Sequence, residues 1–201
     1  MTAIDAHETI TPAHARTALL IVDLQNAYFN NDALRECQAT LLEKTNELIA
    51  MCLENNLPIF TIRTEHYHDL ATWTLNMIDD KQGYLFKDDN DSQSIPGLHL
   101  DQTIEVLKTR DSAFHDTTLS AMLKNHAIET LILCGVSTHT CIAQTAADAY
   151  AQNFRVLLAE EAIASHKPEF HHVALTMLQT EYRQQVVQHS ELKQYIQDNR
   201  Q

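Results

Sequence analysis

Residues 130–159 read TLILCGVSTHTCIAQTAADAYAQNFRVLLA, and this stretch decides the fold. It begins with a continuous apolar run, TLILCGV, which is typical of a strand buried on both faces of a parallel sheet. Helical spacing follows at Ile142, Ala146, Ala149 and Tyr150, and FRVLLA supplies a second strand. A strand, a helix and a strand joined by short connections predict two parallel strands with the helix packed on their sheet.

The same alternation continues outward along the chain. Further strands are expected over residues 17–23, 58–63, 103–108 and 185–188, and helices over 32–56, 117–126, 168–180 and 190–199, the last capped by Ser190. This pattern predicts a three-layer αβα fold of the α/β class, in which helices cover both faces of a six-stranded parallel sheet. Ligands of such sheets bind beyond the carboxyl ends of the strands.

The length of 201 residues fits one domain, so we expect residues 1–201 to form a single domain. Residues 1–16 are polar and aperiodic, which favours a terminal arm or a loose first turn. Residues 64–103 also lack strong periodicity, and a segment this long in a compact domain usually forms a lid or a binding loop. A plain surface insertion is the alternative.

The composition excludes several classes of function. With 14 basic and 27 acidic residues the net charge is −13, so no nucleic-acid partner is expected. The three glycines are too far apart for a Walker loop, a dinucleotide fingerprint or a serine nucleophile elbow. No apolar run could span a bilayer and no signal peptide is evident, so we expect no membrane partner and a cytoplasmic protein whose four cysteines are thiols.

Three polar residues follow or end apolar strands. Asp23 comes after ALLIV, Lys108 after TIEVL, and Cys141 lies just beyond LILCGV in the first turn of the next helix. Because the carboxyl ends of parallel strands share one edge, these side chains are expected to converge. A thiol beside an ammonium and a carboxylate is typical of a nucleophile with its activators, although an aspartate and a lysine at strand ends also form structural ion pairs.

Three separate sequence motifs resemble those of a known protein family. The segments LLIVDLQNAY (19–28), VLKTRDSAFHDTTL (106–119) and LCGVSTHTCIAQTAADAYAQNFRV (133–156) resemble the isochorismatase-like cysteine hydrolase superfamily, which includes nicotinamidases and N-carbamoylsarcosine amidohydrolases. The resemblance implies a Rossmann-like strand order and a catalytic triad of Asp23, Lys108 and Cys141. It also implies that Cys141 attacks a carbonyl carbon and forms a thioester, which water then hydrolyses.

The resemblance implies further features of the loop after the fourth strand. It places a cis peptide bond between Val136 and Ser137, and it makes the backbone amides of Ser137 and Cys141 the oxyanion hole. Gly135 would supply a position without a side chain where the strand turns into this loop. Members of the family usually form dimers or tetramers, so a homodimer or homotetramer is expected, with contacts near residues 64–103 and the fourth helix.

Nicotinamidases of this family hold zinc beside the triad, and here the sequence departs from their pattern. Thr64 stands where those enzymes have a metal-binding aspartate. His66 and His68, even with Glu65, offer two histidines and no reliable third ligand, so we expect no metal and no cofactor.

The expected partner is a small-molecule substrate, and the sequence suggests which residues meet it. Candidates for substrate contact are Gln25, Tyr28, Arg63, His66, Trp73 and Phe114. For Gln25 the alternative is a polar cap or a loop contact, and for Trp73 it is packing of the insertion. Arg63 and Arg110 are also candidates to bind a substrate carboxylate, with Asp111 neutralising Arg110.

The favoured function is hydrolysis of a small carboxamide, ureido or carbamoyl compound. The alternatives are an isochorismatase-type enol ether hydrolase, which in some members needs only the aspartate and the lysine, and a non-catalytic binding member of the fold.

Overall fold

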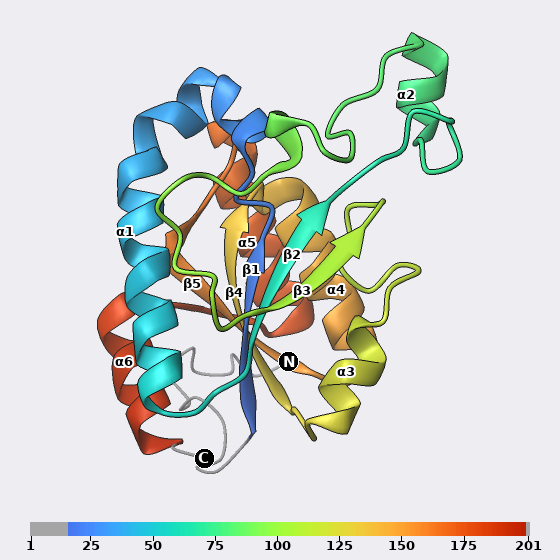
Figure 1. Ribbon diagram of the computed structural model, residues 1–201. Coiled ribbons are helices and arrows are strands. Elements are labelled where there is room, and N and C mark those ends of the chain that lie inside the picture. Colours follow the sequence, from blue (N-terminus) through green and yellow to red (C-terminus); the bar gives the residue numbers. More distant parts are fainter. Residues whose placement is uncertain (1–15, 200–201) are drawn as a thin grey trace.

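The computed structural model describes residues 16–199, and a six-stranded parallel sheet forms its centre (Figure 1). The strands are β1 (Thr17–Val22), β2 (Ile59–Thr64), β3 (Ile104–Lys108), β4 (Thr130–Val136), β5 (Arg155–Ala164) and β6 (Gln185–Val187). Their order across the sheet is β3-β2-β1-β4-β5-β6. The predicted α/β fold is therefore confirmed, and the strand order is Rossmann-like, with its reversal between β1 and β4.

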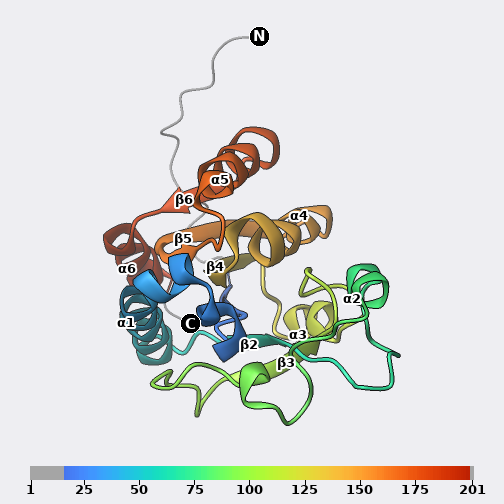
Figure 2. The same ribbon diagram turned by 90° about the horizontal axis from the view of Figure 1, so that it is seen from above.

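Helices cover both faces of the sheet and complete the three layers (Figure 2). On one face lie α1 (Asp32–Glu54) and α6 (His189–Asp198), and on the other lie α3 (Leu119–Asn125), α4 (Ala143–Ala151) and α5 (Pro168–Tyr182). Among residues 16–199, no helix is both long enough and apolar enough to cross a membrane.

Alternate side chains of the central strands point to opposite faces of the sheet, where they pack in two separate apolar cores. Leu19 and Ile21 of β1 pack in the core that also contains α1 and α6 residues. Leu20 and Val22 point the other way, into the core formed with α3, α4 and α5. Every residue of β1 and β4 is buried, which explains why both strands appear in the sequence as unbroken apolar runs.

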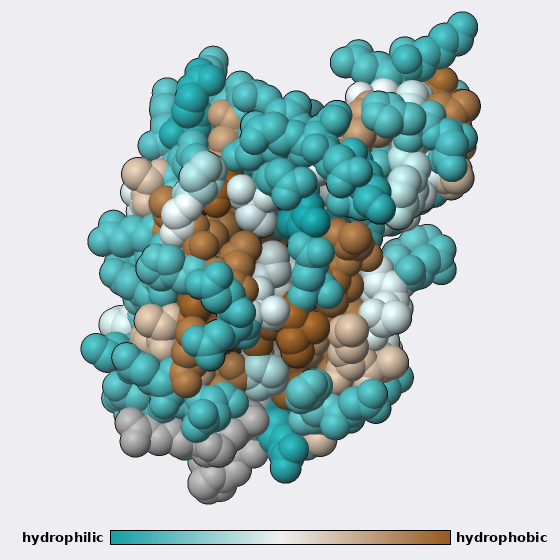
Figure 3. Space-filling model, in the orientation of Figure 1, coloured by the Kyte–Doolittle hydropathy of each residue, from teal (hydrophilic) through white to brown (hydrophobic). Residues whose placement is uncertain are grey.

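The segment 64–103 has two parts with different surroundings. The part around α2 (Leu75–Asp80) stands away from the main body, and Figure 3 shows both hydrophilic and hydrophobic residues on its surface. The part around the 3₁₀ turn η2 (Asn90–Ser92) folds back toward the sheet edge, where Ser94 forms a β-bridge with Gln25. Only this second part is positioned by residues that directly follow β1.

Most element boundaries differ from the sequence prediction by one or two residues, and two of the differences have a clear structural cause. β5 continues to Ala164, because Ile163 and Ala164 pair with β4 again after a register shift. The cap predicted at Ser190 is wrong, since α6 begins at His189. Gln188 is its N-cap and forms a capping box with Glu191, which satisfies the first backbone amides of this helix.

Candidate active site

The carboxyl ends of β1 and β4 mark the point where the strand order reverses, and the three residues predicted to react lie around it. Asp23 follows β1 directly, and Lys108 is the last residue of β3. Cys141 lies in a π-helical turn, η3 (Thr138–Ile142), which runs directly into α4 and forms the first turn of that helix. π-helical turns are rare and are found often at functional sites.

Lys108 reaches across the end of β2 to Asp23. Its Nζ lies 2.7 Å from Asp23 Oδ2, and neither side chain has any exposed surface. The same ammonium donates hydrogen bonds to Thr64 Oγ1 at 2.6 Å and to the Arg110 carbonyl at 3.1 Å, and it lies 3.5 Å from Cys141 Sγ. One buried cation therefore contacts both a carboxylate and a thiol.

Thr64 fixes the orientation of Asp23 from the end of β2. Its backbone N–H donates to Asp23 Oδ1 at 3.0 Å, and its hydroxyl donates to the same oxygen at 2.9 Å. Since Lys108 holds the other oxygen, rotation of the carboxyl group would break several polar contacts. Sequence reasoning noticed Thr64 only as a missing metal ligand. Its position at a strand end between Asp23 and Lys108 was the signal that could have identified it.

The electrostatics of the site favour a neutral thiol at rest. Burial raises the pKa of Cys141 well above its ordinary value, and the charge of Asp23 raises it further, while Lys108 acts in the opposite direction. Burial alone would lower the pKa of Lys108, but Asp23, Cys141 and Asp111 together outweigh this effect, and the pKa of Lys108 is raised. The resting site thus contains a thiol beside an ion pair.

Gly135 allows β4 to approach β1 next to Asp23. A Cβ atom at Gly135 would lie 1.9 Å from the Val22 carbonyl oxygen, and the φ of Gly135 is +116°, a conformation that residues with side chains rarely adopt. Only glycine fits this position without displacing backbone. The close contact places the loop that carries Cys141 directly against the residue that follows β1.

The loop after β4 contains the residues predicted to form the oxyanion hole. The peptide bond between Val136 and Ser137 is cis. The Ser137 carbonyl accepts hydrogen bonds from the backbone amides of Thr140 and Ile142 at 3.1 and 3.2 Å, and Ser137 Oγ lies 2.8 Å from His166 Nδ1. These contacts close the π-helical turn around Ser137 and Cys141.

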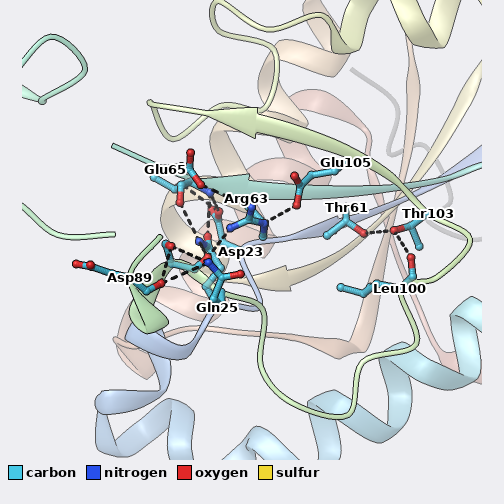
Figure 4. Close-up of polar contacts among 12 residues, drawn as sticks. Asp23, Gln25, Thr61, Arg63, Glu65, Asp89, Leu100, Thr103 and Glu105 are labelled. Carbon is cyan, nitrogen blue, oxygen red and sulfur yellow. Dashed lines mark hydrogen bonds and ion pairs between the residues drawn. The ribbon is translucent and has the colours of Figure 1, made fainter. Parts of the chain in front are cut away.

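Two of the predicted substrate contacts, Gln25 and Arg63, are bonded to the protein itself (Figure 4). Gln25 is buried, and its amide bonds to the backbone of Thr64 and to the Ser92 carbonyl. Arg63 donates to Glu105 Oε1 at 2.7 Å and to the Ser92 carbonyl at 2.6 Å. Both side chains hold the folded-back part of the segment 64–103 against the sheet.

Tyr28 and His66 lie close to the reacting residues. Burial raises the pKa of Tyr28, and the nearby charges of Asp23 and Cys141 raise it further. The His66 side chain places Nδ1 2.9 Å from the Thr72 carbonyl, so this nitrogen carries the proton and Nε2 is left as an acceptor in the neutral ring. Burial lowers the pKa of His66, and the charges of Arg110 and Lys108 contribute.

Trp73 and Phe114 have packing contacts. Trp73 Nε1 donates to the Tyr67 carbonyl at 2.8 Å, and its ring packs near Phe86. Phe114 is buried in the core of the α3, α4 and α5 face, where its ring stacks on Phe154 with a centroid distance of 5.9 Å. These contacts tie both rings to neighbouring parts of the protein, and Phe114 shares its buried cluster with Cys141.

Asp111 lies beside the thiol, and sequence reasoning assigned it another role. Its Oδ1 is 3.9 Å from Cys141 Sγ. The pairing of Asp111 with Arg110 is wrong, because the guanidinium of Arg110 donates to the carbonyls of Thr109, Thr72 and Trp73. The spacing of three residues from Lys108 was the available signal, but the backbone turn that aims the carboxylate at Cys141 is not visible in the sequence.

The residues at the position that corresponds to the zinc site of nicotinamidases do not fit a metal. In the part of the chain that the structure describes, no three histidine, cysteine, aspartate or glutamate side chains are grouped so that they could hold an ion. His66 turns toward Thr72, and His68 stacks on Phe86 with a centroid distance of 3.8 Å. Thr64 donates its hydroxyl to Asp23.

Comparison with known sequences identifies the family of this chain. The model of the isochorismatase domain matches residues 17–191. A probable inactive nicotinamidase from Arabidopsis thaliana is 26% identical over 164 residues, which cover 77% of this chain and 84% of that protein. Nicotinamidase 3 from the same plant is 30% identical over 169 residues, which cover 80% and 79% of the two chains.

Comparison with solved structures supports the fold. An isochorismatase family protein from Desulfovibrio vulgaris matches with a TM-score of 0.82 and 20% sequence identity, covering 92% of this chain and all of that one.

Proposed function

Because this chain belongs to the isochorismatase family, we propose that it is a cysteine hydrolase of a small carboxamide, ureido or carbamoyl compound. The observation that carries this proposal is the contact of one buried ammonium, Lys108, with Asp23 at 2.7 Å and with Cys141 at 3.5 Å. Burying an ion pair costs solvation free energy. A catalytic role gives a reason for keeping the pair beside a thiol, because acyl transfer uses all three groups.

In the first half of the reaction, Cys141 loses its proton as it attacks. The raised pKa of the thiol keeps it protonated until a carbonyl carbon is in place, and the oriented Asp23 carboxylate then accepts the proton. The S–C bond forms and the C–N bond breaks. Asp23 returns its proton to the departing nitrogen, so ammonia or an amine leaves and a thioester remains.

In the second half, Asp23 removes a proton from water, which attacks the thioester carbon. The C–S bond breaks, the proton returns to sulfur, and a carboxylic or carbamic acid leaves. Lys108 remains an ammonium throughout and stabilises the thiolate at each stage. The backbone amides of Ser137 and Cys141 would bind the oxyanion of both tetrahedral intermediates.

The test measures ammonia release from a panel of small amides, ureas and carbamoyl compounds. We expect C141A to lower kcat by about a thousandfold or more, since the nucleophile is lost. The control is C37S, which changes a cysteine of α1 and should leave kcat within about twofold. Turnover by C141A at the parental rate would show that the mechanism is wrong.

The same assay separates the other two candidate functions. Pyruvate release from isochorismate, without ammonia release from any amide, would indicate the enol ether hydrolase. The non-catalytic alternative gains support from the probable inactive nicotinamidase among the relatives. It would be indicated if native Cys141 did not react with a small electrophile while the unfolded chain did.

A further inference from the structure

Two carboxylates flank Cys141, and they have different environments. Asp23 is fully buried and is paired with Lys108. Asp111 is exposed, and its Oδ1 lies 3.9 Å from Cys141 Sγ. In the part of the chain that the structure describes, no lysine, arginine or histidine forms an ion pair with Asp111 within 4.0 Å. Asp111 thus accepts a hydrogen bond from the nucleophile and has no ion-pair partner among the described residues.

The nearby cations are held by other partners. Lys108 is bound to Asp23 and Thr64, and Arg110 donates to three backbone carbonyls. Arg63 is occupied by Glu105 and the Ser92 carbonyl. The guanidinium groups that sequence reasoning offered to a substrate carboxylate therefore already make the polar contacts that a bidentate pair would need.

The remaining lysines near this edge of the sheet are placed over aromatic rings. Lys167 Nζ lies 5.6 Å from the ring centroid of Phe170, and Lys87 Nζ lies 5.7 Å from that of Tyr67. Within residues 16–199, neither the Lys87 nor the Lys167 ammonium forms a hydrogen bond or an ion pair with Asp23, Lys108 or Cys141. Lys108 is the cation at the thiol, and Asp23 balances its charge, so the Asp111 carboxylate is left as the uncompensated charge that an anionic substrate would meet there.

Tyr84 faces the same space from the segment 64–103. Burial raises its pKa, and the charges of Cys141 and Asp111 raise it further, which places the phenol near both groups. The Tyr84 residue is 48% exposed. A molecule bound at Cys141 would therefore lie near a carboxylate and a phenol.

We propose that Asp111 is a substrate-binding residue, and that it selects amides or ureas that carry further N–H or cationic groups near the scissile carbonyl and no carboxylate there. A reacting carbonyl carbon lies about 3–3.5 Å from the attacking sulfur, and its nitrogen is one bond further away. An N–H on that nitrogen, or on a neighbouring amine, is within reach of an oxygen 3.9 Å from Sγ. The inference rests on the proposed hydrolase function and adds the substrate class.

The test compares two alkylating agents that match in size and differ in charge. Iodoacetamide is neutral and carries an amide NH₂, whereas iodoacetate is an anion. In both reactions the Cys141 sulfur forms a bond to carbon, iodide leaves, and the thiol proton goes to Asp23 or solvent. Mass spectrometry of the Cys141 peptide gives the two rate constants, and their ratio cancels differences in thiol reactivity between variants.

We expect D111N to raise the rate constant for iodoacetate relative to that for iodoacetamide by about tenfold, because one nearby negative charge is removed. D111K should shift the ratio further in the same direction. The matched control is D116N, which removes an exposed carboxylate from the same loop and should leave the ratio unchanged within about twofold.

A second measurement uses turnover of butanamide, 4-aminobutanamide and succinamate, which are neutral, cationic and anionic. The wild-type protein should prefer the cationic amide to the anionic one in kcat/KM, and D111N should reduce that preference about tenfold.

The outcomes distinguish this inference from the function on which it rests. Alkylation ratios that are the same in wild type, D111N and D111K would overturn the role of Asp111 while leaving the hydrolase intact. A preference for succinamate would do the same. Failure of native Cys141 to react with either reagent, together with no turnover of any amide, would instead overturn the proposed function and this inference with it.

Discussion

Lys108 Nζ lies 2.7 Å from Asp23 Oδ2, although β2 separates the two strands that carry these residues. The length of the lysine side chain makes this contact possible, and Thr64 at the end of β2 bonds to both residues on the way. The Lys108–Asp23 ion pair therefore links three neighbouring strands, and it is also a candidate part of the active site. It joins β1, β2 and β3 at the edge where Cys141 lies.

Removing the ammonium should destabilise the fold. K108M leaves the Asp23 charge buried without its cation, and losing one partner of a buried pair costs about 3–5 kcal/mol. The double variant D23N/K108M should recover part of this loss, because no buried charge remains. The free energy of unfolding from urea titration checks both values.

A surface ion pair provides the control for this effect. R35A breaks the exposed contact with Asp32 on α1, and we expect a change of about 0.5 kcal/mol or less. Equal losses for K108M and R35A would show that burial adds nothing to the Lys108 pair.

Replacing Asp23 should separate thiol reactivity from catalysis. The charge of Asp23 is one cause of the raised Cys141 pKa, so D23N should lower that pKa. We therefore expect D23N to react faster than wild type with iodoacetamide at pH 8, while its amide turnover falls at least about a hundredfold because the general base is lost. Parallel losses in both assays would contradict the assigned roles.

Gly135 should tolerate no side chain. G135A would bring a Cβ atom to 1.9 Å from the Val22 carbonyl oxygen, so we expect a loss of about 4 kcal/mol or more in unfolding free energy, together with loss of activity. The comparison is G97A, which also has a positive φ but meets only the Leu42 side chain at 3.1 Å. That variant should lose about 1–3 kcal/mol.

Stability should fall as the pH drops below the ordinary titration range of histidine. Burial lowers the pKa of His66 in the folded state, so between that lowered pKa and about 6.5 the unfolded chain binds more protons. Unfolding free energy therefore rises with pH across this window. H66Q should reduce the slope between pH 7 and 5.5, measured by urea titration.

Other histidines contribute in the same direction. His139, His166, His171 and His189 also have lowered pKa values, each chiefly because of burial. H66Q should therefore reduce the slope without abolishing it. The exposed His99 is the control, and an equal change of slope in H99Q would contradict the role of burial at His66.

The strands and their parallel direction were predictable, because both depend on the local pattern of apolar residues along the sequence. β1 and β4 are buried along their whole length, so each shows an unbroken apolar run, and the helical spacing between runs requires parallel strands. The extension of β5 to Ala164 was not predictable, because Glu160 and Glu161 interrupt its apolar run and the pairing resumes only after a register shift. The cap of α6 was also missed, since Ser190 has the favoured residue type but Gln188 makes the bonds.

The α/β architecture and the positions of Asp23, Lys108 and Cys141 at one edge of the sheet follow from sequence patterns alone, because parallel strands place their carboxyl ends together. Tertiary structure decided which polar residues near that edge remain available to a ligand. Gln25, Arg63 and Arg110 look like free polar groups in the sequence, yet each is bonded to a carbonyl or carboxylate supplied by a distant segment. Asp111 looks like the partner of Arg110 and instead faces the thiol. Hydrogen-bond partners far apart in the chain are set by the packing of loops, and local sequence patterns carry little information about that packing.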